Sequence, residues 1–342
     1  MTPESALQYP HPELPAPGRL VRVAPGVHWM RMPLPFALDH INLWLLEDGD
    51  QWVIVDCGIG NEATLGLWQE IIDNCMGGRS VSRVIATHHH PDHVGNAGWL
   101  TRRFEAPLWM AQGEYLSAHA LCEGSSGYGR EHLAALYRAN GLAESHMPGI
   151  LKGREHFKKS VPDFPQSFRR ICEGDQIHIG TNAWTVMMGY GHAPEHAALY
   201  SPALGVLISG DMVLPRISTN VSVPAAQPEA DPLRLFLESL SRYAGLPAQT
   251  LVLPSHGLPF RGMRERIVQL NEHHRLRLEE LLAACESPKC AAEVLDVLFR
   301  RKLDSHQMLF AMGEAMAHLH YLHEQGRVRR MRAGGVVRYQ KS

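Results

Sequence analysis

The chain has 342 residues, of which 45% are hydrophobic and 20% charged, and its formal net charge is −2. These proportions are ordinary for a folded globular protein and exclude a disordered or strongly basic chain. No apolar run approaches the ~18 residues that a membrane-spanning helix needs, so no membrane association is predicted. The length suits a core domain with an appendage.

The first 19 residues predict an extended arm, because prolines stand at positions 3, 10, 12, 15 and 17. Such an arm either docks on a second copy of the chain, in a homodimer, or is a loose tail, and we favour the tail. The segment lacks the basic and apolar regions of a secretory signal. The six cysteines form no C-x-x-C pair, so a cytoplasmic protein with reduced thiols is predicted.

Residues 20–57 cluster β-forming residues around turn residues, which predicts two hairpins. Asn61 then caps a predicted helix that Gly77 and Gly78 end, and the strand VSRVIAT follows at 81–87. This strand-helix-strand order places the next loop at the carboxyl end of a strand, where functional residues are commonly carried.

That loop, THHHPDH at 87–93, holds four candidate metal ligands, His88, His90, Asp92 and His93. In an extended chain, residues two apart point the same way, so His88 and His90 present imidazoles to one ion. Pro91 disfavours helix at His90 and turns the chain, which aims Asp92 and His93 elsewhere. Because one ion needs about four ligands, this cluster with distant helpers indicates two adjacent ions.

More candidate ligands follow downstream, each after a predicted strand. The segment GHAPEH offers His192 and His196, SGD offers Asp211, and PSHG offers His256. Upstream, WVIVDCG places Asp56 at another strand end. Ligands at strand ends, carried on loops, are expected when a sheet holds a site rigid.

These motifs resemble those of the metallo-β-lactamase superfamily of binuclear metallohydrolases, over roughly residues 20–260. The resemblance implies an α/β fold, an αββα sandwich with the site along one edge of two packed sheets, in a catalytic domain at 20–262. It implies one metal ion held by His88, His90 and His192. It implies a second held by Asp92, His93 and His256, with Asp211 bridging the two ions and Asp56 supporting the site from behind. The loop 34–40 flanks the site in such proteins, so Phe36 and His40 are either wall residues or exposed hairpin residues.

Zinc is the predicted metal for both ions, because three neutral histidines suit it, and iron or manganese are the alternatives. Two such ions would move the pKa of a shared water from ~15.7 toward ~7, so that a bridging hydroxide serves as nucleophile. The predicted catalytic residues are Asp92, Asp211 and His196. His196 either positions substrate or hydrogen-bonds a ligand, and we favour the second. Glu195 departs from the family's Gly-His-x-Pro-Gly-His pattern, which has a glycine there.

Residues from about 112 to 169 exceed what one strand and one helix need, and they indicate helices broken by Gly141 and Pro148. Long insertions beside a site are commonly lids or specificity elements, so we predict a helical lid over the metals. Each polar ring of the lid either packs, faces solvent or approaches the substrate. The candidates are Tyr115, Tyr128, His132, Tyr137 and His146.

Residues 263–342 form a predicted C-terminal domain with 14 lysines and arginines against 10 acidic residues, a net charge of +4. The pattern predicts a helix at 263–285, a second from Ser287 and Pro288, a third at 305–325, and a hairpin around Gly334 and Gly335. Three helices and a hairpin resemble a winged helix, as in the lactamase-beta-like proteins that include an endoribonuclease. We favour packing on the core over nucleic-acid binding. The hairpin region carries Arg327, Arg329, Arg330, Arg332 and Arg338.

The predicted function is hydrolysis of a small-molecule acyl thioester or ester by the binuclear site. THHHPDH, with a histidine at its centre, is similar to the glyoxalase II pattern, although the C-terminal region differs from that family's and counts against glutathione thioesters. One alternative is an endoribonuclease or phosphodiesterase of the lactamase-beta-like type, against which the net charge of −6 over residues 1–263 argues. Another is a noncatalytic, metal-stabilised nucleic-acid-binding protein.

Overall fold

The computed structural model describes residues 7–36, 38–124, 126–152 and 154–342. Residues 1–6 of the predicted arm lie outside the described residues, as do one residue of the loop 34–40 and two of the insertion. The rest of the arm is tied to the chain. Gln8 and Arg261 exchange two backbone hydrogen bonds, of 3.1 and 2.8 Å, and Leu7 is buried. The loose tail that we favoured is therefore wrong for this described part.

The larger of two main sheets has the strand order β1-β2-β3-β4-β5-β6-β7. The neighbours from β1 to β4 pair antiparallel, as the two predicted hairpins require, and those from β4 to β7 pair parallel. The strands are β1 (Val21–Ala24), β2 (Val27–Pro33), β3 (His40–Asp48), β4 (Gln51–Val55), β5 (Val81–Ile85), β6 (Leu108–Met110) and β7 (Arg169–Arg170).

The smaller sheet has the order β12-β11-β10-β9-β8. Its neighbours pair antiparallel except β11 and β12, which are parallel, so both of these strands end at the same edge. The strands are β8 (Gln176–Ile179), β9 (Asn182–Gly189), β10 (His196–Ser201), β11 (Val206–Gly210) and β12 (Leu251–Pro254).

The two sheets pack face to face because alternate residues of each strand point to opposite sides. In β4, Val53 and Val55 belong to the apolar cluster between the sheets, whereas Trp52 and Ile54 belong to the cluster on the outer face. The cluster between the sheets holds side chains of both, among them Trp44 of β3.

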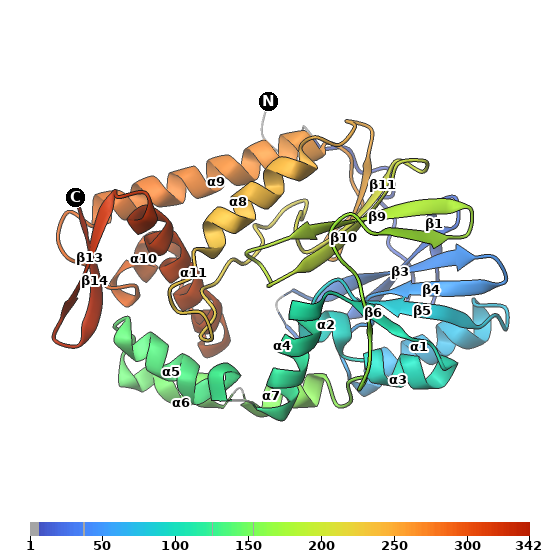
Figure 1. Ribbon diagram of the computed structural model, residues 1–342, viewed down its shortest axis with the longest axis horizontal. Helices are drawn as coiled ribbons and strands as arrows, with labels where there is room; N and C mark the ends of the chain where they lie inside the picture. The colour runs from blue at the N-terminus through green and yellow to red at the C-terminus, as the bar shows by residue number, and fades with distance from the viewer. Residues whose placement is uncertain (1–6, 37, 125, 153) are drawn as a thin grey trace.

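Helices cover both outer faces, which confirms the expected αββα arrangement (Figure 1). α1 (Glu62–Asn74), α2 (Pro91–Val94) and α3 (Ala97–Phe104) lie on the larger sheet. Asn61 caps α1 as predicted, since its side chain accepts a 2.8 Å hydrogen bond from the Thr64 amide. On the smaller sheet lie α8 (Pro232–Tyr243) and the start of α9 (Met263–Ala284).

The insertion is helical, as predicted, and it joins the sandwich to the C-terminal region. It consists of α4 (Gln112–Glu123), α5 (Arg130–Ala139), α6 (Met147–Leu151) and α7 (Arg154–Ser160), with short 3₁₀ turns at Ser126–Tyr128 and Glu144–His146. In Figure 1, α4 lies against the metal-loop side of the sandwich, and α5 and α6 lie beneath the C-terminal helices. The Tyr137 hydroxyl of α5 donates a 2.7 Å hydrogen bond to the Leu309 carbonyl of α11.

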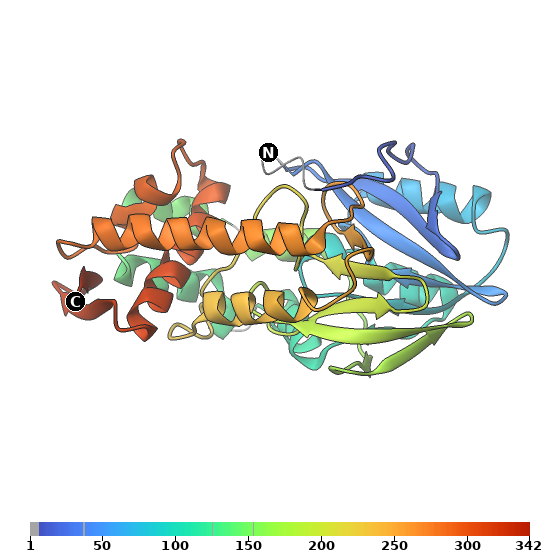
Figure 2. The same ribbon diagram turned by 90° about the horizontal axis from the view of Figure 1, so that it is seen from above.

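The C-terminal region consists of the far half of α9, α10 (Leu295–Leu298), α11 (Ser305–Glu324) and the hairpin β13 (Val328–Ala333) and β14 (Val336–Lys341). α9 runs from the sheets to the far end of the molecule in Figure 2. One apolar cluster extends from Val252 of β12 through Leu281 of α9 to Tyr339 of β14. The region therefore packs on the core, as we favoured.

One predicted helix start in this region is wrong. Ser287 and Pro288 do not begin a helix, because the next residue, Lys289, exchanges backbone hydrogen bonds of 2.9 and 2.7 Å with Tyr339 and is extended. α10 begins only at Leu295, after a 3₁₀ turn at Ala292–Val294. The hairpin turn at Gly334 and Gly335 is as predicted, with φ of 58° and 81°, values that glycine adopts without strain.

None of the helices in the described part of the chain is both long enough and apolar enough to cross a membrane.

Candidate metal centre

The predicted metal ligands converge on one edge of the sandwich, although they come from distant parts of the chain. The loops that carry them follow β5, β9, β11 and β12. Two groups of potential ligand atoms form there, and within each group the atoms lie within 4.8 Å of one another. One group is His88, His90, His192 and Asp211, and the other is Asp92, His93 and His256.

In the first group, three imidazoles face one another. His88 Nε2 lies 2.9 Å from His90 Nδ1 and 3.2 Å from His192 Nε2. His192 Nε2 is also 3.4 Å from Asp211 Oδ2. Burial holds the pKa of His88 and of His90 well below the usual range, and the neighbouring histidines lower it further. Both rings are therefore neutral. Neutral imidazole is the form that binds a metal ion.

The second group gathers around Asp92. Its Oδ2 atom is 3.6 Å from His93 Nε2 and 3.5 Å from His256 Nε2. Asp211 faces this group with its other oxygen, since Oδ1 lies 3.6 Å from His93 Nε2 and 3.5 Å from His256 Nε2. The Asp211 carboxylate thus lies between the two groups with one oxygen toward each, where the family resemblance expects a bridging ligand.

Two buried polar atoms between the ligand groups lack a hydrogen-bond partner in the described part of the chain, as expected of atoms that bind a cation. His93 Nε2 and Asp211 Oδ1 have no hydrogen-bond partner among the described residues. A buried polar atom without a partner costs about 1–3 kcal/mol, and a divalent cation between these atoms would satisfy both. Burial disfavours a charged His93, but Asp56, Asp92 and Asp211 outweigh it and raise the pKa of this ring to about 10. Such a concentration of negative charge attracts a cation.

Hydrogen bonds behind the ligands fix which ring nitrogen faces the site. His192 Nδ1 donates to the Asn220 carbonyl and His256 Nδ1 to the His40 carbonyl, each at 2.8 Å. A ring that donates through Nδ1 keeps the lone pair of Nε2 for a metal ion. His93 Nδ1 bonds to Asp56 Oδ2 at 2.8 Å in the same way.

Asp56 lies behind the site, as the resemblance implied. Its carboxylate also accepts hydrogen bonds from the amide and hydroxyl of Thr87, at 2.8 and 2.9 Å. Asp56 has a φ of 63°, a left-handed conformation that is unusual for a residue other than glycine. The strained turn aims its carboxylate at the start of the THHHPDH loop.

The loop of His256 is held by residues of β3. Asn42 of β3 donates through its side-chain amide to the carbonyls of Pro254 and Gly257, at 2.8 and 2.7 Å. The ring of His40 accepts a 2.8 Å hydrogen bond from the Gly257 amide. His40 was a candidate wall residue, and the structure instead places it beneath the His256 loop.

His196 lies behind the metal groups and belongs to neither of them. It is fully buried, and its Nε2 accepts a 3.1 Å hydrogen bond from the Asp211 amide. Burial, with His192 nearby, lowers the pKa of His196 to about 3, so the ring is neutral. A side chain at Gly210, whose φ is +53°, would bring a Cβ atom to 2.3 Å from this nitrogen. The glycine therefore leaves room for the contact that fixes the backbone of Asp211.

Sequence reasoning missed Glu114, a fully buried carboxylate of α4. It accepts hydrogen bonds from the amide and Nδ1 of His89, at 3.0 and 2.5 Å, and from the amide of Glu195 at 2.6 Å. Glu195 in turn accepts a 2.6 Å hydrogen bond from the Gly113 amide. This reciprocal arrangement, here called the Glu114 clasp, ties α4 to both histidine loops. It also gives Glu195, the departure from the family pattern, a structural partner.

We expect Glu114→Gln to weaken metal binding about 10–100-fold while the fold is kept, because supports behind metal ligands have effects of this size. The amide would place a donor opposite the backbone N–H groups that the carboxylate now accepts. Metal affinity can be measured by competition with a coloured chelator. The matched control is Glu123→Gln, on the exposed face of the same helix. Equal metal affinity in both variants would show that the clasp does not support the site.

A cavity of about 430 Å³ adjoins the first metal group and is bounded by the insertion and the C-terminal region. His89, His90 and His192 line one part of it, and Leu309 and Phe310 of α11 line another. Two of the lid candidates, Tyr128 and Tyr137, also line it.

The other lid candidates lie elsewhere. Tyr115 stacks on Phe168 with ring centroids 3.8 Å apart, and its hydroxyl donates to the Pro165 carbonyl. His132 bonds to the Ala225 carbonyl at 2.9 Å, and His146 is exposed. These residues could not be separated from Tyr128 and Tyr137 beforehand, because the orientation of each ring depends on tertiary contacts.

The αββα sandwich with clustered histidine and aspartate ligands at one edge defines a metallo-hydrolase fold. The chain belongs to the metallo-beta-lactamase superfamily, whose family model matches residues 37–256. A second model, described as the metallo-beta-lactamase-like C-terminal domain, matches residues 278–342.

Individual relatives share this likeness over 55% to 100% of the chain. A beta-lactamase domain protein from Burkholderia ambifaria, known from a crystal structure, is 49% identical, with 100% of both chains covered and a TM-score of 0.92. The Bacillus subtilis protein YqjP, named as a probable metallo-hydrolase, is 26% identical over 86% of this chain and 91% of its own. The human acyl-coenzyme A thioesterase MBLAC2 is 25% identical over 55% of this chain and 63% of its own.

Proposed function

We propose that this metallo-hydrolase cleaves small-molecule acyl thioesters or esters. The observation that carries the proposal is the cavity beside His90 and His192, because most of its described lining residues are apolar and no acidic residue is among them. Such walls suit an acyl chain whose carbonyl lies at the metal groups. The relative MBLAC2 is named as an acyl-coenzyme A thioesterase, which agrees with this substrate class.

The residues present would hold two divalent cations, for which we propose zinc. His88, His90, His192 and Asp211 would hold one, and Asp92, His93, His256 and Asp211 the other. When bound, such ions supply Lewis acidity toward the carbonyl and move the pKa of water from ~15.7 toward ~7.

The chain's own residues then orient the reacting groups and move protons. Asp92 is the more exposed of the two central carboxylates, with 18% of its side chain accessible against 10% for Asp211, so it is placed to exchange a proton with solvent. Asp211 holds the two groups together. His196 is a positioning residue in this proposal, because its hydrogen bond to the Asp211 amide fixes that residue and it does not line the cavity.

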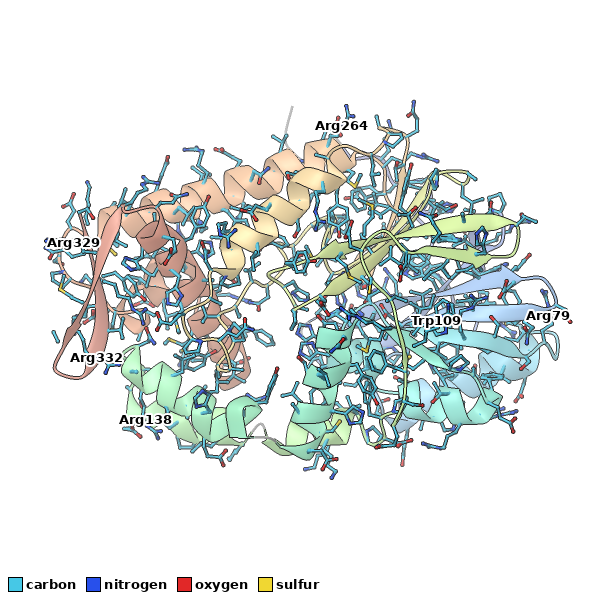
Figure 3. The ribbon with its side chains drawn as sticks, viewed as in Figure 1. Arg79, Trp109, Arg138, Arg264, Arg329 and Arg332 are labelled. Carbon is cyan, nitrogen blue, oxygen red and sulfur yellow. The ribbon has the colours of Figure 1, made fainter. Side chains whose placement is uncertain are left out.

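Nucleic acid is the weaker alternative substrate. Binding a phosphate backbone takes several cations along its path, yet Arg130 is the only lysine or arginine among the described lining residues of the cavity. In the hairpin, Arg330 pairs with Glu229 and Arg338 with Glu293 at 2.8 Å. Arg329 and Arg332 lie at the end of the molecule opposite Trp109 of β6, away from the metal groups (Figure 3).

We expect the purified, metal-loaded protein to hydrolyse acyl thioesters and to leave RNA intact. The measurement is metal analysis followed by a panel of thioesters, lactones, phosphodiesters and RNA. Release of the free thiol reports thioester cleavage, release of acid reports lactone cleavage, and the appearance of shorter or dephosphorylated products reports phosphodiester and RNA cleavage. A matched sample of His88→Ala, which removes a ligand of the first group, should be inactive. Cleavage of RNA without cleavage of any thioester or ester would replace this proposal with the endoribonuclease alternative, and bound metal without any hydrolysis would favour a noncatalytic binding protein.

A further inference from the structure

The cavity has two chemically different ends. The metal-loop end is lined by His89, His90 and His192, and the far end by α5 of the insertion. Figures 1 and 2 place α5 beside the C-terminal helices and away from the sheets that carry the metal loops. Apolar side chains are the larger part of the remaining described lining. They include Leu121, Leu133, Val223, Leu235, Leu309 and Phe310.

Arg130 brings a positive charge to the far end. It stands one and two helical turns before Leu133 and Tyr137, so all three share the face of α5 that lines the cavity. The side chain of Arg130 is half-buried. Across the part of the chain that the structure describes, its guanidinium has neither a hydrogen bond nor an ion pair, and the neighbouring Glu131 is exposed.

A half-buried guanidinium without a carboxylate is unfavourable by itself, because it loses part of its hydration and gains no partner. Burial accordingly lowers the pKa of Arg130 from its usual range, and the Tyr137 hydroxyl nearby only partly offsets this effect. Arginine nevertheless stays charged at neutral pH, so the cavity keeps a fixed positive charge that a bound anion would pair.

We infer that the substrate is an acyl thioester or ester whose acyl chain carries a carboxylate at its remote end, and that Arg130 binds this carboxylate. The inference rests on the proposed function, which it narrows from acyl substrates in general to anionic ones. We assign the anion to the acyl side because apolar residues outnumber polar ones in the described lining, which suits methylene groups. The amide-rich arm of a peptide thiol would need a polar partner for each of its amides.

The test compares two thioesters of the neutral thiol N-acetylcysteamine that differ only in the remote charge, the octanoyl and the 7-carboxyheptanoyl derivatives. We expect the metal-loaded protein to prefer the carboxylated substrate in kcat/KM. In Arg130→Met, which keeps the volume without the charge, KM for the carboxylated substrate should rise about 10–100-fold, the loss of one hydrogen-bonded charge pair. The kcat value and the kinetics of the octanoyl substrate should hardly change. Arg130→Lys should keep part of the preference.

The matched control is Arg138→Met on the same helix. Arg138 pairs with Glu144, does not line the cavity and lies on the outer side of α5 in Figure 3. This variant should behave as the unaltered protein does. S-octanoylglutathione tests the other possibility, because its charges are on the thiol and not on the acyl chain. A rise in KM that Arg130→Met causes only for this substrate would overturn the assignment of the anion to the acyl side.

Binding of octanoate separates this inference from the proposed function. Calorimetry should show weaker octanoate binding to Arg130→Met than to the unaltered protein or Arg138→Met, whether or not any thioester is cleaved. Equal octanoate affinity in the three proteins would overturn the inference. Hydrolysis of the octanoyl thioester without any preference for the carboxylated one would also overturn it while leaving the proposed function intact.

Discussion

Asp211→Asn should reduce turnover by about a thousandfold or more and leave the fold intact. The Asp211 carboxylate faces both metal groups, with Oδ2 toward His192 and Oδ1 toward His93 and His256. Lewis-acid stabilisation by metal ions is worth several kcal/mol, and each ~1.4 kcal/mol is a factor of ten in rate. The fold should persist because the Asp211 amide keeps its hydrogen bond to His196.

Three measurements on this variant separate a lost site from a lost fold. Steady-state kinetics give the loss of activity, metal analysis gives the number of ions kept, and circular dichroism with thermal unfolding reports the fold. Asp50→Asn, at an exposed turn between β3 and β4, is the matched control for loss of one negative charge. Activity within a few fold of the unaltered enzyme would mean that Asp211 does not connect the two groups.

Removing the metal should lower the thermal stability by a large amount. Without cations, the centre leaves His93 Nε2 and Asp211 Oδ1 buried without partners and brings His88, His90 and His192 nitrogens together. A free metal concentration ~1,000-fold above the dissociation constant adds about 4 kcal/mol per site. For a domain of this size that corresponds to a rise of roughly 8 °C in Tm for each occupied site.

Differential scanning calorimetry of chelated and reloaded protein measures this effect. In Asp211→Asn the rise on reloading should be much smaller, because the carboxylate that faces both groups is gone. An equal rise in Tm on reloading the two proteins would contradict this prediction. It would mean that the stabilising ions bind at other sites, such as the protein surface.

The sequence indicated the ligand loops because their pattern is local. The short segment THHHPDH supplies four candidate ligands, His88, His90, Asp92 and His93. Each downstream candidate follows a recognisable strand. Strands that end at one edge of a sandwich bring such loops together whatever the separation along the chain. The αββα arrangement followed from the same strand and helix signals together with the family resemblance.

The residues that hold the ligand loops in place could not be predicted from the sequence, because their role depends on tertiary contacts. Glu114 is one acidic residue among many in amphipathic segments, and only its burial against His89 and Glu195 distinguishes it. Ser287 and Pro288 carry a valid local helix signal, but pairing of Lys289 with the distant Tyr339 overrides it. The same limit applied to the lid, where similar rings divide between the cavity, the core and the surface.

The grip of β3 on the His256 loop links assembly of the centre to the order of synthesis. The amide of Asn42 donates to the Ser255 carbonyl at 2.7 Å, and its side chain holds the carbonyls on either side of His256. A nascent chain can expose the THHHPDH histidines long before residue 256 leaves the ribosome. The group of Asp92, His93 and His256 then stays incomplete until a late strand docks beside one of the earliest. If both groups hold an ion as we propose, full metal loading is a signature of a finished sandwich.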